Sequence, residues 1–169
     1  MTLPFFIGLL FPGLMVISAS MDFLTMTIPN AIPALLLLVY LGLAAVYLPL
    51  MAIVSDVSCG LTVLAITFVM FSMRWIGGGD AKLGAATALW MGWAALADYG
   101  VAASIFGGVL TLGLLTARST PLPALAARVP ALGRLHDPKC GVPYGIALAA
   151  AGLVEYPHTL IWTSLFARP

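Results

Sequence analysis

Two aspartates occupy positions where a charge is costly, in a chain that carries few charges. Asp80 directly follows the glycines from Gly77 to Gly79, and Asp22 lies shortly before Pro29. An acid at the centre of a membrane helix costs about 2.5–3.5 kcal/mol by insertion scales, which indicates a function for acids among apolar runs. Two close carboxyl groups can share a proton and act as base and acid on a water that attacks a peptide carbonyl. The pair predicts a proteolytic dyad.

The composition predicts an integral membrane protein with one domain over residues 1–169. Of the 169 residues, 62% are hydrophobic and only 8% are charged, and the mean hydropathy is +1.11. An average soluble domain is about 25% charged. The seven Lys and Arg residues form no dense patch, so we expect the lipid bilayer as a partner and no nucleic acid.

Apolar runs long enough to cross a bilayer follow one another along the chain. Residues 55–58 are expected to close the second run, and Asp98-Tyr99-Gly100 is expected to form a tight turn between the fourth and fifth. The first run lacks a basic segment before it, so we expect it to remain in the mature protein. We predict an all-α polytopic bundle of about six transmembrane helices. The runs cover residues 3–20, 31–54, 59–76, 81–97, 101–117 and 142–167.

The distribution of basic residues predicts the orientation. With the N-terminus outside, the inner loops hold six of the seven basic residues, and only Arg168 lies elsewhere, as the positive-inside rule requires. Asp56 and Asp98 then become solvated acids of the outer loops. The same topology places Asp22 and Asp80 on the cytoplasmic face, separated by two spans.

The remaining polar residues give weaker signals. Residues 118–141 are rich in proline and cannot form one regular helix, and we expect Arg128 and Arg134 there to reach anionic headgroups. Glu155 is expected at the outer interface. Cys59 and Cys140 are predicted at opposite faces, too far apart for a disulfide. No metal or organic cofactor is expected, because His136 and His158 have no further ligands at convincing spacing.

Three motifs together resemble those of a known family. Asp22 is followed six residues later by Ile-Pro-Asn at 28–30, residues 77–83 fit a GxGD-x-K pattern, and residues 142–147 read Val-Pro-Tyr-Gly-Ile-Ala. The chain resembles the type IV prepilin peptidases over nearly its whole length, and specifically their small branch that serves Flp or tight-adherence pili. Larger relatives carry a cytoplasmic domain with CxxC pairs and methylate the new N-terminus. Nothing here resembles that domain, so methylation is not implied.

The resemblance implies an aspartic endopeptidase of the bacterial inner membrane. Its substrate is a prepilin-like membrane protein, whose short basic leader is removed at the cytoplasmic face just after a glycine. The catalytic residues would be Asp22 and Asp80. Further motif residues expected to line the site are Gly77, Gly79, Lys82, Asn30, Pro143 and Tyr144.

Each of these residues also has a structural interpretation. Asp22 and Asp80 suit helix caps, the glycines suit close helix packing, and Lys82 suits an anchor at the membrane interface. Asn30 suits a cap, and Pro143-Tyr144 a helix start. Two other functions remain open: a small proton- or cation-coupled transporter or channel that uses Asp22 and Asp80, and an inactive structural member of an assembly machinery.

Overall fold

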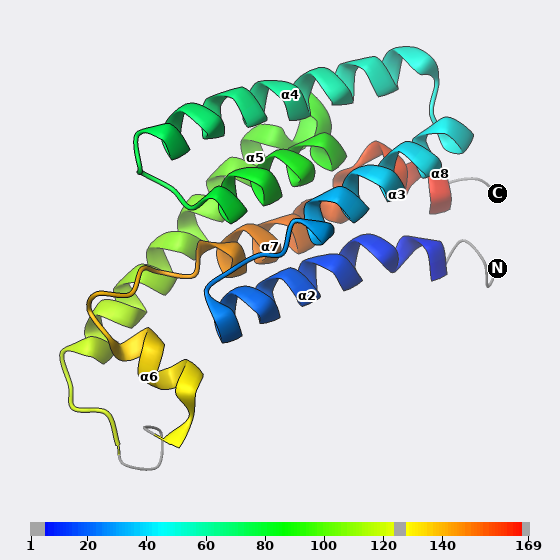
Figure 1. The fold of residues 1–169 in the computed structure, drawn as a ribbon. Coiled ribbons are helices and arrows are strands. Elements are labelled where there is room, and N and C mark those ends of the chain that lie inside the picture. Colours follow the sequence, from blue (N-terminus) through cyan, green and yellow to red (C-terminus); the bar gives the residue numbers. More distant parts are fainter. Residues whose placement is uncertain (1–5, 124–127, 167–169) are drawn as a thin grey trace.

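The computed structural model describes residues 6–123 and 128–166, and these contain helices without strands. The all-α prediction is confirmed. Figure 1 shows the helices running roughly side by side, with α6 beyond one end of the bundle. The elements are α2 (Leu10–Thr25), α3 (Ala31–Tyr47), α4 (Leu50–Ser72), α5 (Gly78–Arg118), α6 (Pro130–His136), α7 (Tyr144–Glu155), the 3₁₀ turn η2 (Tyr156–His158) and α8 (Leu160–Phe166).

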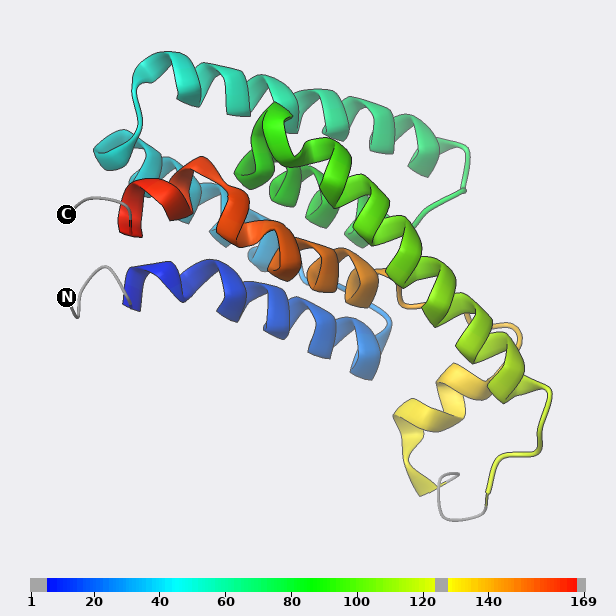
Figure 2. The same cartoon turned by 180° about the vertical axis from the view of Figure 1, so that it is seen from behind.

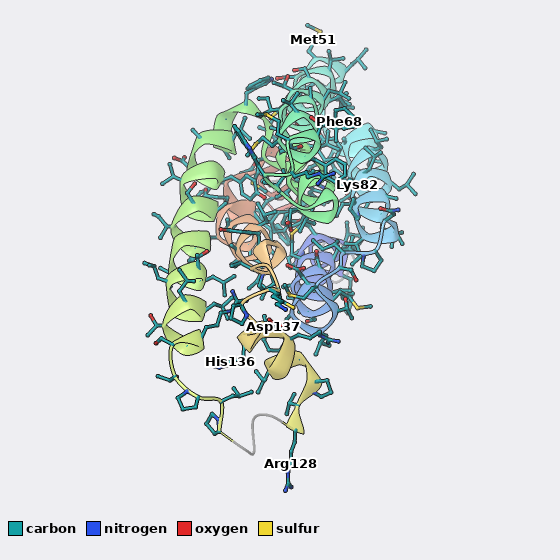
Figure 3. The ribbon with its side chains drawn as sticks, turned by 60° about the vertical axis from the view of Figure 1, so that its left-hand side comes forward. Met51, Phe68, Lys82, Arg128, His136 and Asp137 are labelled. Atoms are coloured by element: carbon teal, nitrogen blue, oxygen red, sulfur yellow. The ribbon has the colours of Figure 1, made fainter. Side chains whose placement is uncertain are left out.

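Several helices present their apolar side chains outward, as lipid-facing helices do. Three described segments, Phe6–Thr25, Leu50–Ser72 and Gly78–Arg118, are long and apolar enough to cross a membrane, and Ala31–Tyr47 is a shorter apolar helix. Met51 on α4, for example, is 80% exposed and points away from the bundle (Figure 3). The chain is therefore a membrane helical bundle. The number of spans and their orientation stay predictions.

The boundary between α3 and α4 differs from the sequence-based expectation. Leu48 and Pro49 are extended, with ψ angles of 148° and 150°, because proline disfavours helix in the residue before it. The break thus comes before Asp56, which lies inside α4 and is only 4% exposed. The prediction of a solvated loop acid at Asp56 is wrong. Its burial is compensated by the Tyr40 hydroxyl, which donates a hydrogen bond of 2.5 Å to Asp56 Oδ2.

The reversal inside α5 also lies elsewhere than predicted. Gly92 has φ 60° and ψ −179°, a conformation that glycine adopts at little cost. The chain turns back there, so residues 78–91 and 93–118 form two helices (Figures 1 and 2). The tight turn predicted at residues 98–100 is wrong: Asp98 is exposed on the second helix, and Tyr99 is 4% exposed in the core.

Aromatic side chains pack the centre of the bundle. The ring of Phe11 lies 4.8 Å from that of Trp90 and 4.6 Å from that of Tyr156. The Trp90 indole N–H donates to the carbonyl oxygen of Leu36 at 3.1 Å, which satisfies its polar atom inside the core. These contacts hold α2, α3, the first half of α5 and the segment after α7 together. The ends of α2 and the starts of α5 and α7 are thereby fixed at the same end of the bundle (Figure 1).

Two arginines tie the segment after α5 to this end. Arg118 Nε donates to the Leu135 carbonyl at 2.7 Å, and its Nη2 donates to the carbonyls of Cys140 and Gly141 at 3.0 Å each. Arg134, which was expected at lipid headgroups, donates to the carbonyl of Leu24 at the end of α2. The expected headgroup contact of Arg128 stays a prediction; its side chain extends beyond α6 (Figure 3).

Glu155 lies next to a histidine, and the two cysteines form no disulfide with each other. Glu155 is 9% exposed, and its Oε2 lies 3.1 Å from His158 Nδ1. Its predicted place at the outer interface stays a prediction. Cys59 and Cys140 are both free thiols.

Candidate active site

Asp22 lies in the last turn of α2 and its side chain points into the protein. It is only 5% exposed. Helix α2 ends at Thr25. The next residue, Met26, adopts a left-handed conformation with φ 55° and donates its N–H to the Asp22 carbonyl at 2.8 Å. This turn leads directly into the loop of the Ile-Pro-Asn motif. The acid is therefore held where a helix gives way to a loop, as the sequence suggested.

Gly145, in the first turn of α7, fixes the Asp22 carboxylate. Its backbone N–H donates a hydrogen bond of 2.7 Å to Asp22 Oδ2 across 123 residues of sequence. An added Cβ at Gly145 would lie 2.7 Å from both Asp22 Oδ2 and Ile28 Cδ1, so only glycine fits. Free N–H groups at a helix start favour a negative group. Gly145 belongs to the motif at residues 142–147, but it was not among the predicted site residues.

Asp80 lies in the first turn of α5, directly after the three glycines. Gly77, the residue before the helix, is extended with ψ 147°. Its backbone N–H donates a hydrogen bond to the Asp80 carboxyl. A Cβ at Gly77 would come within 2.9 Å of Asp80 Oδ2. A Cβ at Gly79 would lie 3.1 Å from Ile28 Cβ. The glycines thus let the Asp80 carboxyl fold back on the helix start and let the Ile28 loop pack closely.

The two aspartates line the same cavity. Its volume is about 300 Å³, and its walls come from the loop after α2 and the start of α5. Residues separated by 58 positions in the sequence therefore meet at one site. The cavity is lined by Asp22, Met26, Thr27, Ile28, Gly77, Gly78, Gly79 and Asp80.

Lys82 and Asn30, both expected at the site, contact each other instead of the aspartates. Lys82 Nζ donates to Asn30 Oδ1 at 2.8 Å. Positions two apart on a helix do not share a face, so Lys82 points away from Asp80. Both residues line a second cavity, on the other side of α5, between α3 and α4. The pair joins the motif at residues 28–30 to the motif at residues 77–83.

Pro143 and Tyr144 form the start of α7, as predicted. Pro143 is fully buried and precedes the first residue of the helix. The Tyr144 ring packs against Gly107 on α5, where a Cβ would lie 3.2 Å from the ring, and its hydroxyl lies 3.1 Å from Thr111 Oγ1. Neither side chain lines the cavity of the two aspartates. Their role here is to place the Gly145 amide.

Within residues 6–123 and 128–166, no three His, Cys, Asp or Glu side chains gather as metal ligands would. Among the residues that line the cavity of the two aspartates, the polar side chains are those of Asp22, Thr27 and Asp80. Two carboxyl groups beside one small cavity suit general acid and base catalysis on a bound water.

The comparisons with known proteins identify the family. A model of the type IV leader peptidase family matches residues 9–112. The chain belongs to this family. The chain is thus a peptidase by family. The matched range includes both aspartates that line the cavity. The match ends before Gly145. No curated protein and no solved structure was found to match the chain. None of these findings favours a transporter.

Proposed function

We propose that this leader peptidase is an aspartic endopeptidase that removes the basic leader of a type IV, Flp-like prepilin at the cytoplasmic face of the bacterial inner membrane. The observation that carries the proposal is the shared cavity of Asp22 and Asp80, with a volume of about 300 Å³. Such a cavity has room for a water molecule between the acids and for the peptide carbonyl that it attacks.

In the proposed reaction, one carboxylate takes a proton from the water as the water adds to the scissile carbonyl. The protonated partner gives its proton to the developing oxyanion or to the leaving amine. The hydrogen bond from the Gly145 amide holds the Asp22 carboxylate in one orientation, which supports catalysis by positioning. Gly77, Gly78 and Gly79 line the same cavity, so a substrate beside Asp80 would meet backbone there instead of side chains.

The test uses the whole protein in vesicles together with an Flp-type pilin precursor. Asp22→Asn and Asp80→Asn keep the shape of each side chain but remove its acid-base function, so cleavage should fall by about 10²–10⁴-fold. Asp98→Asn is the matched control, because Asp98 is exposed on the second half of α5, and it should cleave at the wild-type rate. Normal cleavage by either dyad variant would refute the proposal.

A further inference from the structure

A second cavity, about 380 Å³ in volume, lies between α3, α4 and the first half of α5. Its lining is apolar except at one end, where Asn30 and Lys82 meet. Leu37 and Leu61 on its walls are 44% and 60% exposed, whereas Leu89 on its floor is 4% exposed. The cavity is therefore a groove that is open toward the lipid. We call it the α3–α5 groove.

The three helices line the α3–α5 groove with the same spacing. Each contributes four positions in the pattern i, i+3, i+4 and i+7, namely 30, 33, 34 and 37 on α3, 57, 60, 61 and 64 on α4, and 82, 85, 86 and 89 on α5. This is the pattern of one face of a helix over two turns, a length of about 10 Å. Three such faces around one groove are the surroundings that a further helix would meet in a bundle.

Small residues let a helix come close along this groove. Ala34, Ala85 and Ala86 are three of the lining residues, whereas the missing side chain of Gly60 serves its close contact with Leu89 on α5. Helix pairs in membranes rely on small residues for close backbone contact, whereas a flexible acyl chain needs no such surface. The lining therefore favours a helix as occupant over a lipid.

The polar end of the α3–α5 groove lies at the level of the candidate active site. Asn30 is two residues after Ile28 and Lys82 is two residues after Asp80, and both Ile28 and Asp80 line the active-site cavity. Figure 3 shows Lys82 between α3 and α4. α4 runs opposite to α3 and the first half of α5 (Figure 1), and the groove follows these helices from this end over about two turns.

We propose that the α3–α5 groove is the docking site for the hydrophobic membrane helix of the substrate. This inference rests on the proposed function, since a leader peptidase cuts a chain whose hydrophobic helix follows the cut bond. A helix seated in the groove ends beside Asn30 and Lys82, and the chain before it then reaches the cavity of Asp22 and Asp80 across the 26–29 loop. The groove selects the substrate's helix, and the dyad cuts the segment before it.

Photocrosslinking tests the docking site without requiring cleavage. A benzophenone side chain replaces Leu61 in the groove, or, as the control, Ile66 on the same helix. Ile66 is 56% exposed, similar to the 60% of Leu61, but does not line the groove. The Asp80→Asn protein carrying either probe is placed in phosphatidylethanolamine and phosphatidylglycerol vesicles with an Flp-type pilin precursor. We expect an adduct with the precursor's hydrophobic helix from position 61, at about ten times the yield from position 66.

A second pair of variants tests whether filling the groove excludes the substrate. Ala34 is exposed and lines the groove, and Ala45 is exposed on the same helix outside it. Ala34→Phe should lower the adduct yield at position 61 about tenfold, because the ring occupies the docking space. Ala45→Phe should leave the yield unchanged, and thermal unfolding should be the same for both.

The outcomes separate this proposal from the proposed function. Equal adducts from positions 61 and 66, adducts at 61 with lipid alone, or an Ala34→Phe variant that crosslinks like the wild type would overturn the docking site. None of these results bears on the dyad. Normal cleavage by Asp80→Asn without the probes would overturn the dyad, and the crosslinking result would still decide the groove.

Discussion

Replacement of Gly145 by alanine is the sharpest structural perturbation of the candidate site. The added Cβ would lie 2.7 Å from Asp22 Oδ2 and 2.7 Å from Ile28 Cδ1. Real Cβ atoms essentially never show contacts under 3.0 Å, and ordinary contact begins at 3.4 Å. Since the backbone of α7 is helical here, the Asp22 carboxylate and the Ile28 side chain must move instead.

The displacement sets the size of the effect. To reach ordinary contact, the Asp22 oxygen must move by about 0.7 Å, which stretches its 2.7 Å hydrogen bond from the Gly145 amide. A misplacement of about 1 Å can cost about 10²-fold in rate, so we expect kcat/KM to fall by roughly 10- to 100-fold. The overpacking costs about 1–3 kcal/mol of stability, offset in part by the better helix propensity of alanine, worth up to about 1 kcal/mol.

The assay is cleavage of a pilin precursor in vesicles, with thermal unfolding measured on the same preparations. Gly108→Ala is the matched control, because a Cβ at Gly108 on α5 meets nothing within 4 Å, and it should be as active as the wild type. Ile28→Val removes the Cδ1 atom from one of the two close contacts. In that background Gly145→Ala should regain part of its lost stability but not its activity, because the contact with Asp22 remains.

A Gly145→Ala variant with wild-type kcat/KM would refute this reasoning. It would mean that the Asp22 carboxylate need not occupy the position that the Gly145 amide gives it. Full recovery of activity with Ile28→Val would also contradict it, since packing at Ile28 and not the position of Asp22 would then limit the rate.

Two further predictions concern the buried polar contacts at the other end of the bundle. Gly92→Ala should lower the unfolding temperature for two reasons. The combination of φ 60° and ψ −179° is essentially restricted to glycine and costs another residue about 1–3 kcal/mol, and the new Cβ would collide with the Asp56 carboxylate. Gly100→Ala is the control, because a Cβ at Gly100 meets nothing within 4 Å. Tyr40→Phe should destabilise the protein by about 1–3 kcal/mol, because Asp56 loses the hydroxyl that donates to it at 2.5 Å. Thermal unfolding in detergent measures both.

These two variants should act on stability and not on the chemical step. The folded fraction of each should cleave at the wild-type rate, since neither side chain lines the cavity of the aspartates. A Gly92→Ala protein as stable as its control would show that the reversal in α5 does not depend on the left-handed conformation. A fully stable Tyr40→Phe protein would show that Asp56 finds another partner.

The sequence predicted the fold class and the meeting of Asp22 and Asp80 because both depend on patterns along the chain. Apolar runs identify membrane helices, and counting them places acids separated by an even number of spans at the same end. The motifs around residues 28–30 and 77–80 then predicted the residues of the candidate site. The resemblance to prepilin peptidases is confirmed by the family match over residues 9–112.

The errors arose where a tertiary contact overrides the local pattern. An acid in an apolar run is costly, so Asp56 was predicted to lie in a loop that closes a helix. In the structure Asp56 lies inside α4, where the hydroxyl of Tyr40, 16 residues earlier, donates a hydrogen bond to its carboxylate. Pro49 was the local signal that marked the true break. The α5 reversal occurs at Gly92, between apolar residues, and not at the polar residues 98–100, because only Gly92 takes a left-handed φ without strain.

Some site features could not be read from hydropathy or spacing. The need for glycine at position 145 comes from a backbone hydrogen bond across 123 residues. Its place in the motif after Tyr144 was the available signal. The contact between Lys82 and Asn30 likewise depends on how α3 and α5 pack, although both residues stood in the motifs.

Cleavage by the double variant Asp22→Asn/Asp80→Asn, compared with each single variant, tests the central claim most directly. Residues that act as one catalytic unit show non-additive losses. The dyad predicts that each single variant loses about 10²–10⁴-fold in kcat and that the double variant loses no more than the more impaired single one. Losses that multiply in the double variant, or a single variant that cleaves at the wild-type rate, would contradict a shared role for the two aspartates.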